Sequence, residues 1–241
     1  MKFLTNLTML LLFLSAFFSC KKKEFSTVPI TSLRIVNVVT GGTTARLNYY
    51  PTNINNIPAT AAQSLSGGVF SLPAGNPDIY VWPITDSLKP YYNSNKGLSM
   101  AAGEYFTLFL CGTSTTPEGI LVKENYQNHT DSVMGVRFIN LSPNSTPVNV
   151  TLSTSTSVNE FANVAYKQIS DFKQFHTKSV NATYTFQVRS AVNPGTILSS
   201  VTITLTGTSA IPRFKNLTLV FRGNVGGTGT LAPGITRVNH Y

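Results

Sequence analysis

The residue best placed for a chemical reaction in this sequence is Cys20, because of the segment that precedes it. A basic start is followed by an apolar run from Leu4 to Phe18, and small Ser19 stands directly before the cysteine. A positive charge, a short apolar run and a small residue at a break are typical of a secretory signal peptide. The run is shorter than the roughly 20 residues that a membrane-spanning helix needs. We therefore expect residues 1–19 to be a signal peptide.

The segment around Cys20 resembles a bacterial lipoprotein signal of the Bacteroidetes type, in which the peptidase cuts before a cysteine that carries diacylglycerol. The resemblance implies a chain anchored to the outer membrane of the cell envelope, with the periplasmic and surface faces both open. Each buried CH₂ contributes about 0.8 kcal/mol, so two or more acyl chains hold a protein stably on a membrane. The alternative is an ordinary cleaved signal with a coincidental cysteine. Lysines 21–23 either keep the tether solvated or pair with anionic lipid headgroups.

The second cysteine, Cys111, ends the apolar, strand-like run 105–111. With Cys20 lipidated, it has no partner within the chain, so neither a disulfide framework nor a cysteine-based zinc site is expected. We expect an inert buried thiol. A reactive thiol, the alternative, would need a nearby cation or histidine.

An enzyme active site usually needs paired titratable groups, and this sequence shows no clear motif that would pair them. His129, His176 and His240 are not at metal-ligand spacing, and no G-x-S-x-G motif occurs. The glycine-rich stretch Gly223–Gly234 lacks Gly-Lys-Ser/Thr, so it predicts a hairpin loop rather than a phosphate cradle. We expect no catalytic residues, no metal, no cofactor and no enzyme. A hydrolase that brings a histidine and a carboxylate together in the fold stays an alternative.

Aromatic side chains are the candidates for a ligand-binding surface: Trp82, Tyr91 and Tyr92. Consecutive strand residues point to opposite faces, so one tyrosine of the pair can be exposed. Exposed Trp and Tyr side chains can stack on sugar rings or anchor a protein partner. Packing in the core is the alternative.

Composition limits the partners. Only 11% of the residues are charged, against roughly 25% in a typical globular domain. Residues 26–126 carry five basic and five acidic side chains, whereas residues 127–241 carry nine and three, a net charge of +6. The basic residues are scattered and accompany no nucleic-acid-binding motif, so no nucleic acid partner is expected. They either solubilise the second half or attract anionic glycans or lipopolysaccharide.

The elements that must position these residues are strands, and they recur. Alternating apolar and polar residues rich in β-branched types, separated by Gly-Gly, Pro-Gly and Asn-Pro turns, predict an all-β chain. Five blocks recur in the same order, with an offset that grows from 103 to 115. The paired blocks are 33–38 with 136–141, 45–48 with 148–151, 79–82 with 184–188, 105–112 with 216–223, and 119–126 with 234–241.

One stretch is ambiguous between helix and strand. Residues Val158 to Phe172 fit a helical stripe, but the repeat places them and their counterpart, Ala59 to Leu65, between strands. We therefore expect a strand pair. The fold predicted is two tandem immunoglobulin/transthyretin-like antiparallel β-sandwich domains.

A family resemblance covers roughly residues 31–241. The second half resembles the domain-of-unknown-function family 4397 in four segments, 137–143, 147–150, 163–166 and 169–172, and the first half in the turn Leu72–Gly75. The resemblance implies extracytoplasmic β-sandwich proteins, often lipid-anchored, without established catalytic residues. The expected organisation is a signal peptide at 1–19, a lipidated cysteine and tether at 20–30, one sandwich at 31–126, a linker at 127–133 and a second sandwich at 134–241.

Together these observations favour a lipid-anchored, non-enzymatic cell-envelope protein that acts as a binding, adhesion or scaffold module. Its partners would be the membrane, through the anchor, and an envelope protein or glycan. The alternative is a carbohydrate-binding accessory lipoprotein of a glycan-uptake system.

Overall fold

The computed structural model describes residues 27–50, 67–95, 97–130, 132–177, 183–205 and 212–240, and the structural statements below concern those residues. The signal peptide and Cys20 therefore lie outside the described part. The elements are fifteen strands and one short 3₁₀ turn. They are β1 (Ile30–Asn37), β2 (Ala45–Tyr50), β3 (Gly67–Pro73), β4 (Asp78–Pro83), β5 (Tyr92–Asn93), β6 (Tyr105–Gly112), β7 (Pro117–Lys123), β8 (Val133–Asn140), β9 (Val148–Leu152), β10 (Ser155–Val164), β11 (Lys173–His176), β12 (Thr183–Ser190), β13 (Ile197–Thr204), β14 (Asn216–Arg222), η1 (Gly229–Leu231) and β15 (Gly234–Asn239).

The strands form two β-sandwiches, and the expectation of an all-β fold with two such domains is confirmed. In the first, the sheet β3-β1-β6-β7 packs on the sheet β2-β4-β5, and in the second β11-β8-β14-β15 packs on β10-β9-β12-β13. Most neighbours are antiparallel, but β1 pairs with β6 and β8 pairs with β14 in parallel. The two sheets that contain these pairs have the same pattern of neighbours. No described helix is long and apolar enough to cross a membrane.

The ambiguous stretch is extended rather than helical, as expected. Residues 155–164 form β10, and Ile169 makes an isolated bridge with Ile139 before β11 begins at Lys173. The irregular register between β10 and β9 explains why the apolar spacing imitates a helix. Its counterpart, residues 59–65, lies outside the described residues.

The last recurring block is shifted by one residue from the sequence match. In the ladders, Leu108 pairs with Leu121, and the equivalent Leu219 pairs with Arg237, so the strands β7 and β15 correspond at an offset of 116 rather than 115. A shift of one residue exchanges the two faces of a strand. The correct match therefore places His240 where the first half has Glu124.

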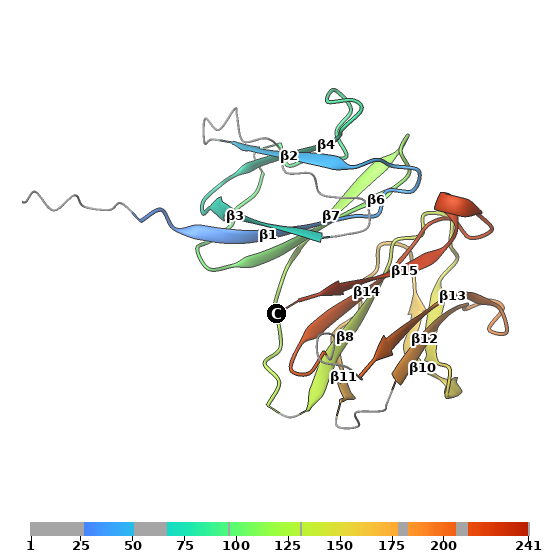
Figure 1. The fold of residues 1–241 in the computed structure, drawn as a ribbon. Helices are drawn as coiled ribbons and strands as arrows, with labels where there is room; N and C mark the ends of the chain where they lie inside the picture. The colour runs from blue at the N-terminus through green and yellow to red at the C-terminus, as the bar shows by residue number, and fades with distance from the viewer. Residues whose placement is uncertain are drawn as a thin grey trace, which may run out of the picture.

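The two sandwiches share one further apolar layer, and it lies between their central sheets. We call it the middle layer; its buried residues are Val36, Val38, Phe109, Cys111, Ile139, Leu141, Val220 and Val238. Figure 1 shows β1, β6, β8 and β14 between the outer strands β2 and β4 of one sandwich and β10, β12 and β13 of the other. The central strands bury both faces, which is why they read as nearly continuous apolar runs.

We expect Phe109→Ala to destabilise the protein by about 3–5 kcal/mol, because the ring is fully buried in the middle layer and its removal leaves a cavity. Guanidinium denaturation followed by circular dichroism measures the change. Leu88→Ala is the control, because Leu88 is 87% exposed and its truncation should change stability by less than about 0.5 kcal/mol. Equal effects of the two substitutions would contradict the shared layer.

Candidate functional site

A buried ion pair connects the two sandwiches. Glu124 follows β7 of the first, and Arg137 lies in β8 of the second, with 2.6 Å between Arg137 Nη2 and Glu124 Oε1. Their side chains are 0% and 6% exposed, respectively. Arg137 Nε also donates to Thr218 Oγ1 at 2.8 Å, and its guanidinium lies 4.7 Å from the centre of the Phe172 ring. The pair is therefore enclosed by contacts that partly replace water.

A histidine continues this network. Thr218 Oγ1 is 2.7 Å from His240 Nε2, and Tyr126 Oη is 2.9 Å from His240 Nδ1, so both ring nitrogens have a neutral partner. Burial, followed by the charges of Arg137 and Arg34, lowers the pKa of His240 to about 3. The imidazole is thus neutral at ordinary pH. Burial also raises the pKa of Tyr126 to about 12, with a smaller contribution from Glu124.

The network fixes how the sandwiches are oriented, because it joins side chains from both of them. A buried ion pair adds little net stability, because removing two charges from water offsets their attraction. Breaking it is costly, since one charge would remain buried alone. Because Glu124 and Arg137 belong to different sandwiches, any rotation between the domains would break the pair. The arrangement therefore favours one fixed domain geometry.

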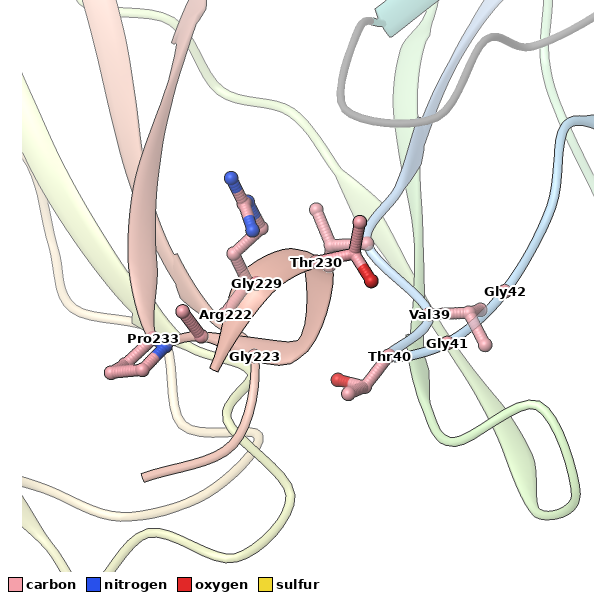
Figure 2. Close-up of a pocket in the computed structure, with 11 residues that line it drawn as sticks. Val39, Thr40, Gly41, Gly42, Arg222, Gly223, Gly229, Thr230 and Pro233 are labelled. Carbon is pink, nitrogen blue, oxygen red and sulfur yellow. The ribbon is translucent and has the colours of Figure 1, made fainter. Parts of the chain in front are cut away.

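A hollow lies elsewhere on the junction, between the turn after β1 and the loop that connects β14 to β15. We call it the junction hollow; it has a volume of about 400 Å³ and is shown in Figure 2. Its first-sandwich wall is 38–42, and its second-sandwich wall is formed by Arg222, Gly223, Gly229, Thr230, Ala232 and Pro233. The second wall is the stretch Gly223–Gly234 that the sequence predicts to be a hairpin loop, and it does connect two adjacent antiparallel strands.

Arg222 supplies the positive charge of the junction hollow. Its Nε donates to Thr236 Oγ1 at 2.9 Å, and a Cβ on Gly234 would meet its Nη2 at 3.2 Å, so the guanidinium lies over that glycine. Burial lowers the pKa of Arg222. No ion pair to a described carboxylate compensates for this partial loss of water.

Thr40 faces Arg222's wall from the first sandwich. The residue is only 7% exposed, and its Oγ1 has no hydrogen-bond partner in the described part of the chain. Figure 2 shows its side chain pointing from the turn toward the segment at Gly223. A hydroxyl that is removed from water without a partner costs about 1–3 kcal/mol.

The aromatic candidates from the sequence do not form one surface. Tyr91 is 4% exposed in the first core, and its Oη accepts a hydrogen bond from Thr43 N at 2.9 Å, so its ring is not available for stacking. Tyr92 is half-buried against the same core, and burial raises its pKa. Neither tyrosine of this pair is exposed, in agreement with the packed-core alternative, because the core extends beneath β5. Trp82 lies half-buried on the opposite face of its sheet.

Trp82 has an aromatic neighbour that sequence reasoning did not single out. Tyr80 lies two residues away on the same face of β4, and the ring centroids are 5.6 Å apart. Arg46 is the cross-strand partner of Trp82, and Asn48 and Asn93 flank Tyr80. We call this face, with its two rings and polar neighbours, the outer aromatic face. Alternation along β4 was the signal that could have identified Tyr80.

The remaining candidates are placed separately. Cys111 is fully buried, as expected for an inert thiol, and burial raises its pKa to about 11. Tyr166 Oη donates to Glu118 Oε1 at 3.0 Å, and Lys167 pairs with the same carboxylate, beside Cys111. His129 Nε2 is 3.1 Å from Asn216 Oδ1. Among the residues described, no three potential metal ligands form a group.

Sequence reasoning missed the residues that define the junction. Glu124 and Arg137 are 13 residues apart, Arg137 and Thr218 are 81 apart, and no local motif joins them. The recurring arginine in β1 and β8 was a usable signal, because Arg34 and Arg137 occupy equivalent positions in the repeat. Each is the charged residue of its central strand and lies between apolar neighbours.

Comparison with known proteins gives one result. A family model described as Domain of unknown function (DUF4397) matches residues 31–151. The matched segment contains the strands of the first sandwich and the first two strands of the second, β8 and β9. Among curated proteins, none matches the chain.

We expect the stability of the protein to fall as the pH drops from about 6.5 toward 3. In that window the unfolded chain binds a proton at His240 that the folded chain does not, because the folded pKa is about 3 against 6.5 for a free imidazole. The contribution is complete above pH 6.5 and is lost at up to about 1.4 kcal/mol per pH unit below it. His240→Gln should flatten the pH dependence of Tm, whereas the exposed His176→Gln should preserve it. Parallel curves for all three proteins would contradict the assignment.

Proposed function

We propose, from the premise that the chain belongs to the DUF4397 family, that it is a lipid-anchored, non-enzymatic protein of the cell envelope that acts as a binding, adhesion or scaffold module. The observation that carries the proposal is the domain junction, where an enclosed ion pair and an apolar layer hold two sandwiches in one geometry. Such a rigid body presents its surfaces at fixed spacing to a partner. Fixed spacing is what a scaffold or an adhesion module requires.

The proposal includes a duplicated domain. The central sheets of the two sandwiches have matching neighbours, each with one parallel pair of central strands, β1 with β6 and β8 with β14. Equivalent arginines, Arg34 and Arg137, point toward the junction from β1 and β8. This correspondence supports tandem copies of one family domain, although the family model itself matches only residues 31–151.

The proposal also includes the anchor and the location. The signal pattern before Cys20 supports a lipidated cysteine on the outer membrane, with the sandwiches on its periplasmic or surface side. Residues 21–30 would serve as the tether, and β1 begins at Ile30. The partners would be the membrane, through the acyl chains, and an envelope protein or glycan.

A second candidate function is that of a carbohydrate-binding accessory lipoprotein in a glycan-uptake system. The outer aromatic face favours it, because Trp82 and Tyr80 offer two neighbouring rings for sugar stacking while Arg46 and two asparagines offer hydrogen bonds to hydroxyls. This face differs from the one that the sequence predicts, since Tyr91 and Tyr92 pack toward the core.

We expect Cys20→Ala to abolish lipid labelling in cells, because the acyl chains would be attached to that thiol. Incorporation of radiolabelled palmitate and globomycin-sensitive processing measure the modification. Cys111→Ala is the matched control and should keep both, since that thiol is buried. Labelling that survives in Cys20→Ala would exclude the anchor.

For the second candidate, we expect Trp82→Ala to reduce binding on a glycan array at least tenfold, because the indole ring on which a sugar ring would stack is lost. Tyr80→Phe should retain most binding, since it keeps the ring and removes only the hydroxyl that donates to Ser87 O. Leu88→Ala is the control for a neighbouring exposed apolar residue. A wild-type chain that binds no glycan on the array would eliminate this candidate without affecting the anchor.

A further inference from the structure

We infer that the junction hollow is a binding site for an oxyanion, a carboxylate or phosphate group, that is held by Arg222 and Thr40 from the two sandwiches. The inference rests on the proposed binding role but not on the lipid anchor. It assigns a ligand class to the hollow, which has no residue in common with the outer aromatic face.

The two ends of the junction are built differently. As a result, Arg222 has no ion-pair partner in the described part of the chain. The register of the central hairpins makes Arg222 and Gly234 equivalent to Cys111 and Glu118. At the Glu118 end, Lys167 of the second sandwich reaches across and neutralises the carboxylate. At the Arg222 end, the described part of the first sandwich offers no carboxylate in return, and the hollow occupies that place.

The chain has few acids with which Arg222 could pair. Of the seven described carboxylates, five already form ion pairs with other cations, Asp78 accepts a hydrogen bond from Ser94, and Asp171 neither pairs with Arg222 nor lines the hollow. The segment 51–66, which follows β2 in the sequence, contains neither Asp nor Glu. A half-buried guanidinium in this situation gains most from an external anion, which can accept two parallel hydrogen bonds from its fork.

Thr40 supplies an independent second observation. Its hydroxyl is buried, has no partner among the described residues, and points toward the opposite wall. In the folded protein this hydroxyl reduces stability, since a methyl group of the same shape would cost nothing to bury. An incoming oxygen would accept its hydrogen bond. The unpaired donor and the unpaired cation thus belong to opposite walls of one hollow.

Glycines at positions 223 and 234 let the backbone of the second-sandwich wall pack closely against its neighbours. A Cβ on Gly234 would crowd Arg222 Nη2 at 3.2 Å, and a Cβ on Gly223, whose φ is +79°, would lie 2.2 Å from Ala232 O. The loop therefore requires glycine at Gly223, whereas a side chain at Gly234 would displace the Arg222 guanidinium by a few tenths of an ångström. A volume of about 400 Å³ is at the lower end of the usual range for small-ligand sites, so a group the size of one sugar acid fits.

The test titrates the purified full chain, in detergent, with three probes: inorganic phosphate, galacturonate and neutral galactose. Thermal denaturation detects binding, because a ligand that binds only the folded protein raises Tm. We expect phosphate or galacturonate to raise Tm in a saturable manner and galactose to have no effect. A response to galacturonate alone identifies a carboxylate ligand, and a response to phosphate alone identifies a phosphate ligand.

Two matched pairs of variants locate the site. Arg222→Gln should weaken binding at least tenfold, whereas Arg189→Gln, which removes an equal charge from β12 in the outer sheet of the second sandwich, should leave it unchanged. Thr40→Val should keep or raise the Tm of the free protein and still weaken binding about threefold or more. Thr177→Val also removes a buried, unpartnered hydroxyl, but from outside the hollow, so it should affect only stability.

Three results would overturn the inference. They are the absence of any Tm shift with either anion, an equal shift with galactose, and full binding by Arg222→Gln. None of these results bears on palmitate labelling at Cys20, and a sugar-dependent Tm shift that persists in Arg222→Gln but is lost in Trp82→Ala belongs to the outer aromatic face. Failure of this site is therefore distinguishable from failure of the proposed function.

Discussion

The contact between Glu124 and Arg137 is the constraint on which the arrangement of the two sandwiches depends. The side chains of this ion pair are 0% and 6% exposed; Thr218 and the Phe172 ring replace part of the water that Arg137 loses, whereas Glu124 Oε2 has no hydrogen-bond partner in the described part of the chain. Apolar contacts in the middle layer supply the net attraction, but such contacts are weakly directional. The ion pair is directional, so it selects one orientation among those that the apolar layer would allow.

Fixing that orientation has a consequence at each end of the junction. Where Lys167 and Tyr166 reach Glu118, the second sandwich completes the surface of the first. At the other end, Arg222 and Thr40 line a hollow, and no described side chain of the first sandwich forms an ion pair with Arg222. The chemical difference starts from two equivalent positions, Cys111 and Arg222, one of which is apolar and the other charged. The different residues at these two equivalent positions thus accompany a hollow at one end of the junction and a closed, ion-paired contact at the other.

The sequence predicts the strands well because alternation and turn residues are local signals. Val201–Thr204 and Tyr184–Val188 alternate as half-buried strands do, and both lie in the outer sheet of the second sandwich. The junction is harder to predict, because its contacts join residues from separate strands and one side of each central strand looks like ordinary core. His240 illustrates the limit. The repeat in the sequence aligns His240 with Asn125, whereas the strand ladders align it with Glu124, and the histidine is buried in the junction network.

The same reasoning separates the two candidate binding surfaces. The outer aromatic face depends on residues that alternate along one strand and its neighbours, so its geometry survives small movements between the sandwiches. The junction hollow has one wall from each sandwich, so its shape depends on the ion pair at Glu124 and Arg137 even though neither residue lines it. An anion between Arg222 and Thr40 would in turn stabilise the docked arrangement, because binding and docking must favour each other by the same free energy. The ion pair and the hollow therefore act on a single equilibrium, that between docked and separated sandwiches.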